Sequence, residues 1–313
     1  MQGPVIPDLP RRVTIREVGP RDGLQAEKPL PVEARARLIT YLSRMGIPKI
    51  EAVSFVSPQA VPAMAGAAEV WARVERSPDV QYSALVPNRR GAESAAEAGG
   101  FSSLQAFLAA SDGYNRHNVG KGVRESVRDV QAVAEVGREA GLPVECSISS
   151  AFGDPFDGDV PPSRVVEVAT WVVDAGVEAV SLGDTVGVAT PARVWATVQE
   201  LRDALPELLL NLHFHDTRGA GMANVLAALE LGCDEFDGSV GGIGGSPFAP
   251  GAAGNVATEE LVDMLGDMGI ETGVHSVEGL IEIAQYLESL LGRPLPSRVM
   301  RAGSRPRPGA AQG

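Results

Sequence analysis

The stretch LLLNLHFHD at residues 208–216 is a short apolar run, and GMANVLAALELG at 221–232 continues it as a helical segment that stops at Gly232. The same succession of a strand-like run and a helical run repeats along the whole chain. Eight strand-like runs are expected, at residues 13–19, 49–56, 80–87, 103–111, 144–152, 178–187, 208–216 and 235–245.

This alternation decides the fold class. Strands that alternate strictly with helices are parallel and joined by crossover helices. The runs are mostly apolar or small, as strands buried on both faces should be. Eight units are the number that closes a barrel, so we expect an α/β protein with a single (β/α)8 TIM barrel. An open doubly wound sheet is the alternative, and it is weakened because no GxGxxG opens a helix after the first strand.

The chain of 313 residues is long enough for one barrel of ~250 residues and an addition. We expect the catalytic barrel at residues 13–273 and a helical extension at 274–300. The Pro/Gly/Arg-rich tail at 301–313 is expected to be disordered.

Composition and charge narrow the class of protein. Hydrophobic residues make up 44% and charged residues 21%, as in ordinary globular proteins. The net charge of −13 disfavours binding to nucleic acid or to an anionic membrane. Cys146 and Cys233 form neither a CxxC pair nor a disulfide framework. No apolar run approaches the ~20 residues of a membrane span, and the N-terminus lacks the apolar core of a signal peptide. We expect a soluble, cytoplasmic protein.

A pair of histidines gives the strongest sign of chemistry. His213 and His215 point to the same face of a strand, at the end where barrel active sites lie. Asp22 and Asn255 would add oxygen ligands from adjoining strands. Mixed nitrogen and oxygen ligands without thiolate suit Mg²⁺ or Mn²⁺. A structural or chance pair is the alternative, but two of only four histidines fall on this face.

Acidic side chains in apolar strands point to the same end. Glu51 lies within IEAVSFV, where an unpaired carboxylate would be costly, so it needs a partner. Arg21, which follows the Gly19-Pro20 turn on the neighbouring strand, is the expected partner. Asp184 in LGDTVG also lies in a strand-like run, so its carboxylate needs a partner too, although the signal is weaker. The glycine-rich segment GGIGGSPFAPGAAGN (241–255) is expected to be a mobile loop over the site rather than a phosphate cradle.

Together these motifs resemble the 3-hydroxy-3-methylglutaryl-CoA lyase family of barrel metallolyases, which are related to Claisen-type synthases. Five segments carry the resemblance, in the family's order: VGPRDGLQAEK (18–28), KIEAVSFVSP (49–58), SLGDTVGVATP (181–191), HFHDTRGAGMANVLAALELG (213–232) and GGIGGSPFAPGAAGNVATEEL (241–261). A synthase is disfavoured, because those usually have TLRDGEQ where this chain has GPRDGLQ.

The resemblance implies a (β/α)8 barrel and a role for each matching residue. It implies metal ligation by Asp22, His213, His215 and Asn255, catalytic roles for Arg21, Glu51, Asp184 and Ser246, and substrate-binding positions at Gln25 and Glu259.

The implied reaction is a retro-Claisen cleavage of 3-hydroxy-3-methylglutaryl-CoA to acetyl-CoA and acetoacetate. The cation would polarise the substrate oxygens, and Arg21 would stabilise the enolate oxygen of the thioester. The expected partner is an acyl-CoA substrate, and the expected assembly is a homo-oligomer, a dimer.

One position departs from the family pattern. Ser246 in GGSPF stands where the lyases carry a cysteine in GGCP, and Asp154 follows Gly153 where GCP is common. A hydroxyl is a far weaker acid than a thiol of pKa ~8.5. The alternatives are therefore a lyase for another 3-hydroxy-acyl-CoA, citramalyl-like or with a longer branched chain, and a catalytically silent metal-binding partner subunit.

Overall fold

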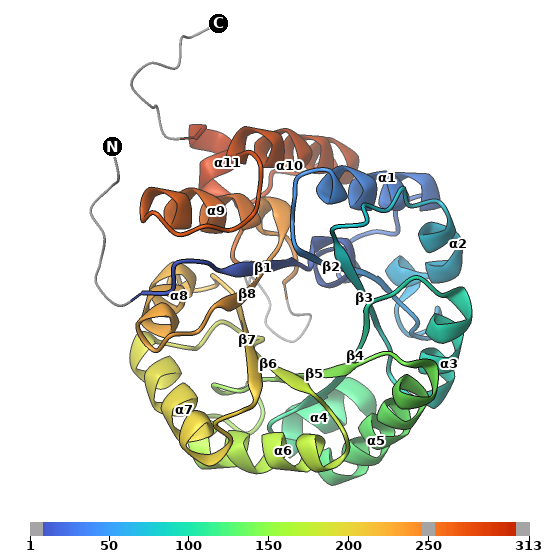
Figure 1. The fold of residues 1–313 in the computed structure, drawn as a ribbon, viewed down its shortest axis with the longest axis vertical. Helices are drawn as coiled ribbons and strands as arrows, with labels where there is room; N and C mark the ends of the chain where they lie inside the picture. The colour runs from blue at the N-terminus through green and yellow to red at the C-terminus, as the bar shows by residue number, and fades with distance from the viewer. Residues whose placement is uncertain (1–8, 246–253, 305–313) are drawn as a thin grey trace, which may run out of the picture.

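A computed structural model describes residues 9–245 and 254–304 and shows a closed barrel of parallel strands in chain order (Figure 1). The strands are β1 (Thr14–Glu17), β2 (Lys49–Ser54), β3 (Gln81–Leu85), β4 (Ser103–Ala109), β5 (Val144–Ser149), β6 (Ala179–Asp184), β7 (Leu209–Phe214) and β8 (Glu235–Gly238). Because β1 pairs with β8 as well as with β2, the sheet closes, and the predicted TIM barrel is confirmed.

Helices surround the barrel as an outer ring (Figure 1). They are α1 (Val32–Ser43), α2 (Ala67–Ala72), α3 (Arg89–Ala98), α4 (Asp112–Val119), α5 (Val123–Ala140), α6 (Pro162–Asp174), α7 (Pro191–Ala204), α8 (Gly221–Glu230), α9 (Thr258–Asp267), α10 (Val277–Leu291) and α11 (Arg298–Ala302). Short helical turns lie at η1 (Gly19–Gly23), η2 (Pro62–Met64) and η3 (Val240–Gly242). The Thr190 side chain caps α7 by accepting a hydrogen bond from the backbone N–H of Arg193, as the Thr-Pro sequence predicts.

The C-terminal helices gather on one side of the ring. Figure 1 shows α9, α10 and α11 together next to β1 and α1. The expected extension at 274–300 contains α10, and the boundary at residue 273 stays a prediction. Arg301 and Ala302 of the expected disordered tail are helical, since α11 runs to Ala302. Residues 305–313 lie outside the described residues.

Polar side chains fill part of the barrel interior, where branched aliphatic side chains are usual. We call this set the interior polar layer; it consists of Arg16 on β1, Gln105 on β4, Glu145 on β5, Asn211 on β7 and Asp237 on β8. The Arg16 guanidinium donates to Asp237 Oδ1 at 2.7 Å and Oδ2 at 3.0 Å, to Glu145 Oε2 at 2.8 Å and to Gln105 Oε1 at 3.1 Å. Hydrogen bonding compensates the burial of these charges.

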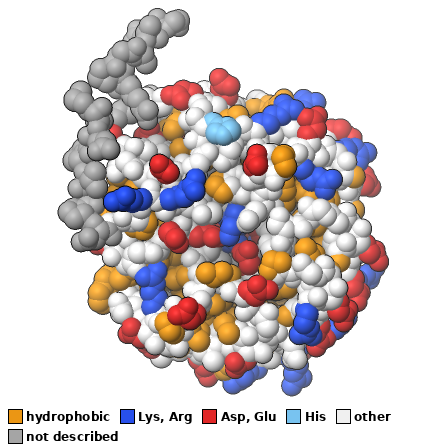
Figure 2. Space-filling model, viewed as in Figure 1, with side chains coloured by type: hydrophobic (Ala, Val, Ile, Leu, Met, Phe, Trp, Pro, Cys, Tyr) orange, Lys and Arg blue, Asp and Glu red, His pale blue; other side chains and the backbone are white. Residues whose placement is uncertain are grey.

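The surface shows no strong separation of charge in the view of Figure 2. Acidic and basic side chains are interspersed on this face, with hydrophobic side chains between them. Among the described helices, none has the length and apolar character that crossing a bilayer requires.

Candidate active site

Three predicted metal ligands meet at the C-terminal end of the barrel. One ligand atom each from Asp22, His213 and His215 lies within 4.8 Å of the other two. The Nε2 atoms of the two histidines are 3.1 Å apart, and His213 Nε2 lies 4.0 Å from Asp22 Oδ2. The convergence follows from the register, because β7 pairs with β8 and β8 pairs with β1, whose end leads into the η1 turn.

Asn255 adjoins this cluster. Its backbone bridges to that of His215, and its amide Nδ2 donates to Asp22 Oδ2 at 2.9 Å and to the carbonyl oxygen of Ile243 at 2.9 Å. Its Oδ1 atom is buried and accepts no hydrogen bond from the residues that the structure describes. The packing here needs a glycine at 244, where φ is +106° and a Cβ atom would lie 2.5 Å from Asn255 Nδ2.

These donors fit a hard divalent cation. The set comprises two imidazole nitrogens, a carboxylate and a buried amide oxygen without a partner among the described residues. Burial and the neighbouring His213 lower the pKa of His215 to about 4, so this imidazole is neutral at pH 7 and has a lone pair to offer. Burial opposes ionisation of Asp22, but Arg21 and the two histidines outweigh it and lower the pKa of its carboxyl.

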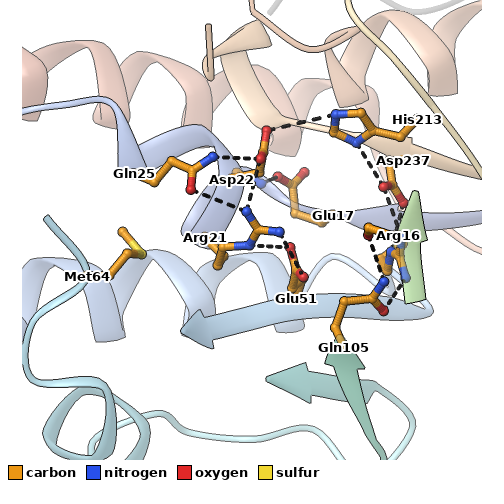
Figure 3. A network of polar contacts seen from close by, with 12 residues as sticks. Arg16, Glu17, Arg21, Asp22, Gln25, Glu51, Met64, Gln105, His213 and Asp237 are labelled. Carbon is orange, nitrogen blue, oxygen red and sulfur yellow. Dashed lines mark hydrogen bonds and ion pairs between the residues drawn. The ribbon is translucent and has the colours of Figure 1, made fainter. Parts of the chain in front are cut away.

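Arg21 links the cluster to Glu51, as the sequence predicted. Its Nε donates to Glu51 Oε2 at 2.7 Å and its Nη2 to Glu51 Oε1 at 3.3 Å, while Nη1 donates to Asp22 Oδ1 at 3.0 Å. Gln25 donates to the same Asp22 oxygen at 2.9 Å, and Figure 3 shows these side chains pointing toward one another. Burial raises the pKa of Glu51 in spite of this pairing. The guanidinium is thus held at two carboxylates beside the candidate cation site.

Glu17 fixes the turn that presents Arg21 and Asp22. Its carboxylate accepts from the backbone N–H groups of Gly19 at 2.7 Å and Val240 at 3.0 Å, and from the Thr258 hydroxyl at 2.5 Å. Burial raises the pKa of Glu17 to about 7. The sequence analysis did not single out Glu17, although a carboxylate next to the GPRDG turn was a possible signal.

Asp184 ends β6 and is almost fully buried. Its Oδ1 accepts from the backbone N–H groups of Val188 at 2.8 Å and Ala189 at 3.0 Å. Its Oδ2 is buried and has no hydrogen-bond partner within the described ranges. Burial raises the pKa of this carboxyl to about 6. Asp184 therefore has one oxygen anchored by backbone N–H groups and one without a hydrogen-bond partner among the described residues.

Two further carboxylates named in the sequence analysis, Glu259 and Asp154, accept hydrogen bonds from the backbone of nearby turns. Glu259 is fully buried, and its two carboxylate oxygens accept from the backbone N–H of Gly241 at 3.1 and 3.2 Å, in the η3 turn. Burial raises its pKa to about 7. Asp154 Oδ1 accepts from the backbone N–H groups of Phe156 at 2.7 Å and Asp157 at 2.9 Å, which stabilises its own turn. Ser246 and most of the expected mobile loop lie outside the described residues.

A second carboxylate in contact with the cluster was missed by the sequence analysis. Asp237 Oδ2 lies 2.9 Å from His213 Nδ1, on the side of the ring away from the candidate cation site. Figure 3 shows Asp237 between His213 and Arg16. The signal was present, because Arg16 in TIREVG and Asp237 in EFDGS are charged residues within buried strands. The argument applied to Glu51 would have found both.

Comparison with known proteins agrees with this geometry. Residues 12–286 match the family model described as HMGL-like. The chain is 43% identical over 290 residues to the hydroxymethylglutaryl-CoA lyase of Bacillus subtilis, covering 92% of this chain and 96% of that protein. It is also 43% identical over 302 residues to the (R)-citramalyl-CoA lyase of Chloroflexus aurantiacus, covering 93% and 95%.

A solved structure extends the likeness to three dimensions. The HMG-CoA lyase of Acinetobacter baumannii, in complex with coenzyme A and 3-methylmalate, superposes with a TM-score of 0.89 at 38% identity, covering 95% of this chain and 98% of that one. With the family model spanning residues 12–286 and relatives more than 40% identical over nearly the whole chain, this chain belongs to the HMGL-like family.

Proposed function

We propose that this protein is a carbon–carbon lyase that depends on a divalent cation, Mg²⁺ or Mn²⁺, and cleaves 3-hydroxy-3-methylglutaryl-CoA to acetyl-CoA and acetoacetate. The observation that carries the proposal is the cluster of Asp22, His213 and His215 beside the Arg21–Glu51 pair, in a chain of this family. Asn255 is the proposed fourth ligand, through its unpartnered Oδ1. When bound, the cation polarises the substrate oxygens.

Arg21 is the proposed stabiliser of the thioester enolate. Its guanidinium is planar and is fixed by Glu51 and Asp22 before substrate arrives, so little reorganisation accompanies the build-up of negative charge. Glu51 acts through Arg21, because its carboxylate is buried against the guanidinium. Gln25 borders the same group and is the proposed polar contact for substrate.

Asp184 is the proposed base for the 3-hydroxyl proton. Its free Oδ2 and a carboxyl pKa of about 6 suit a group that accepts a proton near neutral pH. Once the hydroxyl proton is removed, the C2–C3 bond breaks, the C3 oxygen becomes a ketone, and the bonding electrons form the enolate. Glu259 is the proposed support of the η3 turn.

The enolate carbon must then be protonated. We propose that Ser246 takes part in this step through water, since a hydroxyl does not titrate near pH 7 as a thiol can. Asp154 is the competing candidate: its Oδ1 accepts from two backbone N–H groups, and its Oδ2 is buried without a hydrogen-bond partner among the described residues. Ser246 is preferred because it stands at the position of the family's cysteine.

A second substrate is supported by one finding. The (R)-citramalyl-CoA lyase of Chloroflexus aurantiacus is as similar to this chain as the Bacillus hydroxymethylglutaryl-CoA lyase. A silent partner subunit is disfavoured, because the sequence retains Arg21 and the four proposed ligands Asp22, His213, His215 and Asn255. A homodimer in the cytoplasm stays a prediction.

The test is incubation of the purified protein and Mg²⁺ with a panel of 3-hydroxy-acyl-CoAs. Every cleavage releases acetyl-CoA, so the second product identifies the substrate: acetoacetate from the methylglutaryl thioester and pyruvate from the citramalyl thioester. We expect acetoacetate, and we expect a chelator to stop the reaction. No acetyl-CoA from any member of the panel would contradict the proposal.

A further inference from the structure

The cluster's two histidines have different surroundings on the side of the ring away from the cation site. His213 Nδ1 faces Asp237 Oδ2 at 2.9 Å, whereas His215 Nδ1 is buried and unpartnered among the described residues. The proposed function uses neither Asp237 nor the interior polar layer to which it belongs. Asp237 is nevertheless the one carboxylate among the described residues that contacts the far side of the His213 ring.

The contacts of Asp237 determine its protonation. Arg16 Nε at 2.7 Å and Asn211 Nδ2 at 2.8 Å donate to Oδ1, and Arg16 Nη2 donates to Oδ2 at 3.0 Å. His213 Nδ1 at Oδ2 is the fourth neighbour, so all four lone-pair positions of the carboxylate have a nitrogen in front of them. No position is left for a proton, and an ionised carboxylate only accepts hydrogen bonds.

The tautomer of His213 follows from this contact. A nitrogen that hydrogen-bonds to an acceptor-only group must carry hydrogen, so Nδ1 is the protonated nitrogen of the neutral ring. Nε2 then holds the lone pair, and Nε2 is the atom that faces His215 at 3.1 Å and Asp22 at 4.0 Å. The carboxylate also fixes the plane of the ring.

We propose that Asp237, clamped by Arg16, is a positioning residue that holds His213 as the Nδ1-protonated tautomer and so aims the Nε2 lone pair at the cation site. The inference rests on the proposed function for the presence of a cation. Partners of this kind on the far side of a ligating histidine set both ring orientation and ligand basicity. Arg16 holds both oxygens of Asp237 in one plane, which a single-point cation cannot do.

The first test measures the tautomer in the wild-type protein and uses one variant only to assign the signals. The chain has four histidines, so nitrogen-15 labelling of histidine gives a small set of imidazole signals in NMR spectra of the metal-free protein. His213→Gln identifies the signals of His213 by their loss. We expect the shifts of His213 to show a protonated Nδ1 and an unprotonated Nε2. The opposite tautomer in the wild-type protein would overturn the proposal.

The second test is Asp237→Asn, measured by titration of the full chain with Mn²⁺. Where the amide group turns its NH₂ toward His213, it donates to Nδ1, and the ring proton moves to Nε2. We expect a ~10–100-fold weaker affinity for Mn²⁺, the range found when such partners are changed, and an altered His213 NMR signature. The control is Asp79→Asn, which removes the same charge from an exposed residue before β3. It should leave the affinity unchanged.

A third variant covers the case in which Asp237→Asn does not fold. Arg16→Lys keeps the charge and leaves the His213–Asp237 contact in place but loses the two-point clamp. We expect a loss of Mn²⁺ affinity of less than ~10-fold relative to the wild type, with the tautomer retained. Wild-type affinity in a folded Arg16→Lys variant would contradict the role of the clamp. Unchanged affinity and an unchanged tautomer in a folded Asp237→Asn variant would overturn the proposal. Because Mn²⁺ titration and NMR use no acyl-CoA, these results stand whether or not the lyase assay succeeds.

Discussion

Two arginines in the β1 region, Arg16 and Arg21, each form a two-point ion pair with a buried carboxylate, yet their positions give them different roles. Arg16 lies within the barrel, its side chain is 3% exposed, and its partner Asp237 has a nitrogen in front of every lone-pair position. Arg21 lies at the barrel mouth, its side chain is 11% exposed, and it borders Asp22 in the candidate cation site.

The difference shows what an ion pair can contribute. The interior pair has no free acceptor on Asp237, so it can support a neighbour but has little capacity to receive a ligand. The pair at the mouth lies where substrate enters a barrel of this kind. Burial of an arginine and a carboxylate is thus no evidence of catalysis by itself. The position of the pair along the strand determines whether it can contact substrate.

The largest effect is expected from removing a ligand at the mouth. His215→Ala should abolish cation-dependent cleavage and leave the fold intact, because loss of a side chain at the mouth leaves the packed core untouched. Mn²⁺ stoichiometry, activity and circular dichroism check this. His275→Ala removes an exposed histidine and is the control. If both His213→Ala and His215→Ala bind Mn²⁺ as the wild type does, the cation site lies elsewhere.

The comparison of the two arginines is sharpened by Arg21→Lys. A compact ammonium cannot hold Glu51 and an enolate oxygen together. We expect kcat to fall by at least ~10²-fold, the loss on removing one preorganised oxyanion donor, with Mn²⁺ affinity nearly kept. Arg16→Lys should show the reverse pattern, with weaker Mn²⁺ affinity and kcat largely recovered at saturating Mn²⁺. Near-wild-type kcat in Arg21→Lys would remove Arg21 from the transition state.

A smaller change is expected at the position that departs from the lyase pattern. Ser246→Cys should raise kcat on 3-hydroxy-3-methylglutaryl-CoA by about tenfold, below the ~10²–10⁴-fold of an optimally placed general acid. The variant should also become sensitive to thiol alkylation, whereas the wild type should not. Asp154→Asn should do little, since Asp154 holds its own turn. A strong loss in Asp154→Asn without a gain in Ser246→Cys would reverse the assignment.

The smallest effect concerns pH and the turn that supports Arg21. The folded-state pKa of Glu17 is about 7, above the 4.5 of an ordinary glutamate. Its protonated form is therefore favoured by folding, so this contribution to stability is complete below pH ~4.5 and is lost as the pH rises through 7. The free energy of unfolding should fall less steeply between pH 5 and 7 in Glu17→Gln than in the wild type. Urea unfolding measures this slope, and the exposed Glu33→Gln should leave it unchanged.

Much of the fold could be read from the sequence, because the apolar strand runs and helix stops are local signals. The Arg21–Glu51 pair was predictable for a related reason: a carboxylate in an apolar strand requires a partner, and Arg21 follows the neighbouring strand at the end where the site lies. The partners of Arg16 were harder to predict. Asp237 is 221 residues away and Glu145 is 129 residues away, so the pairing appears only once the barrel is closed and its interior is specified. The role of Glu259 depended likewise on the position of the Gly241 backbone.

The pairing of β1 with β8 has a consequence for the order of events during synthesis. The Asn255 amide that contacts Asp22 is made 233 residues after it, and the Val13 N–H bonds to the carbonyl oxygen of Glu271. A nascent chain that has not yet released β8 and Asn255 from the ribosome lacks a complete cation site, however much of the barrel has formed. Such long-range closure is slow compared with local helix formation. A chain able to complete the candidate cation site therefore exists only after Asn255 has left the ribosome.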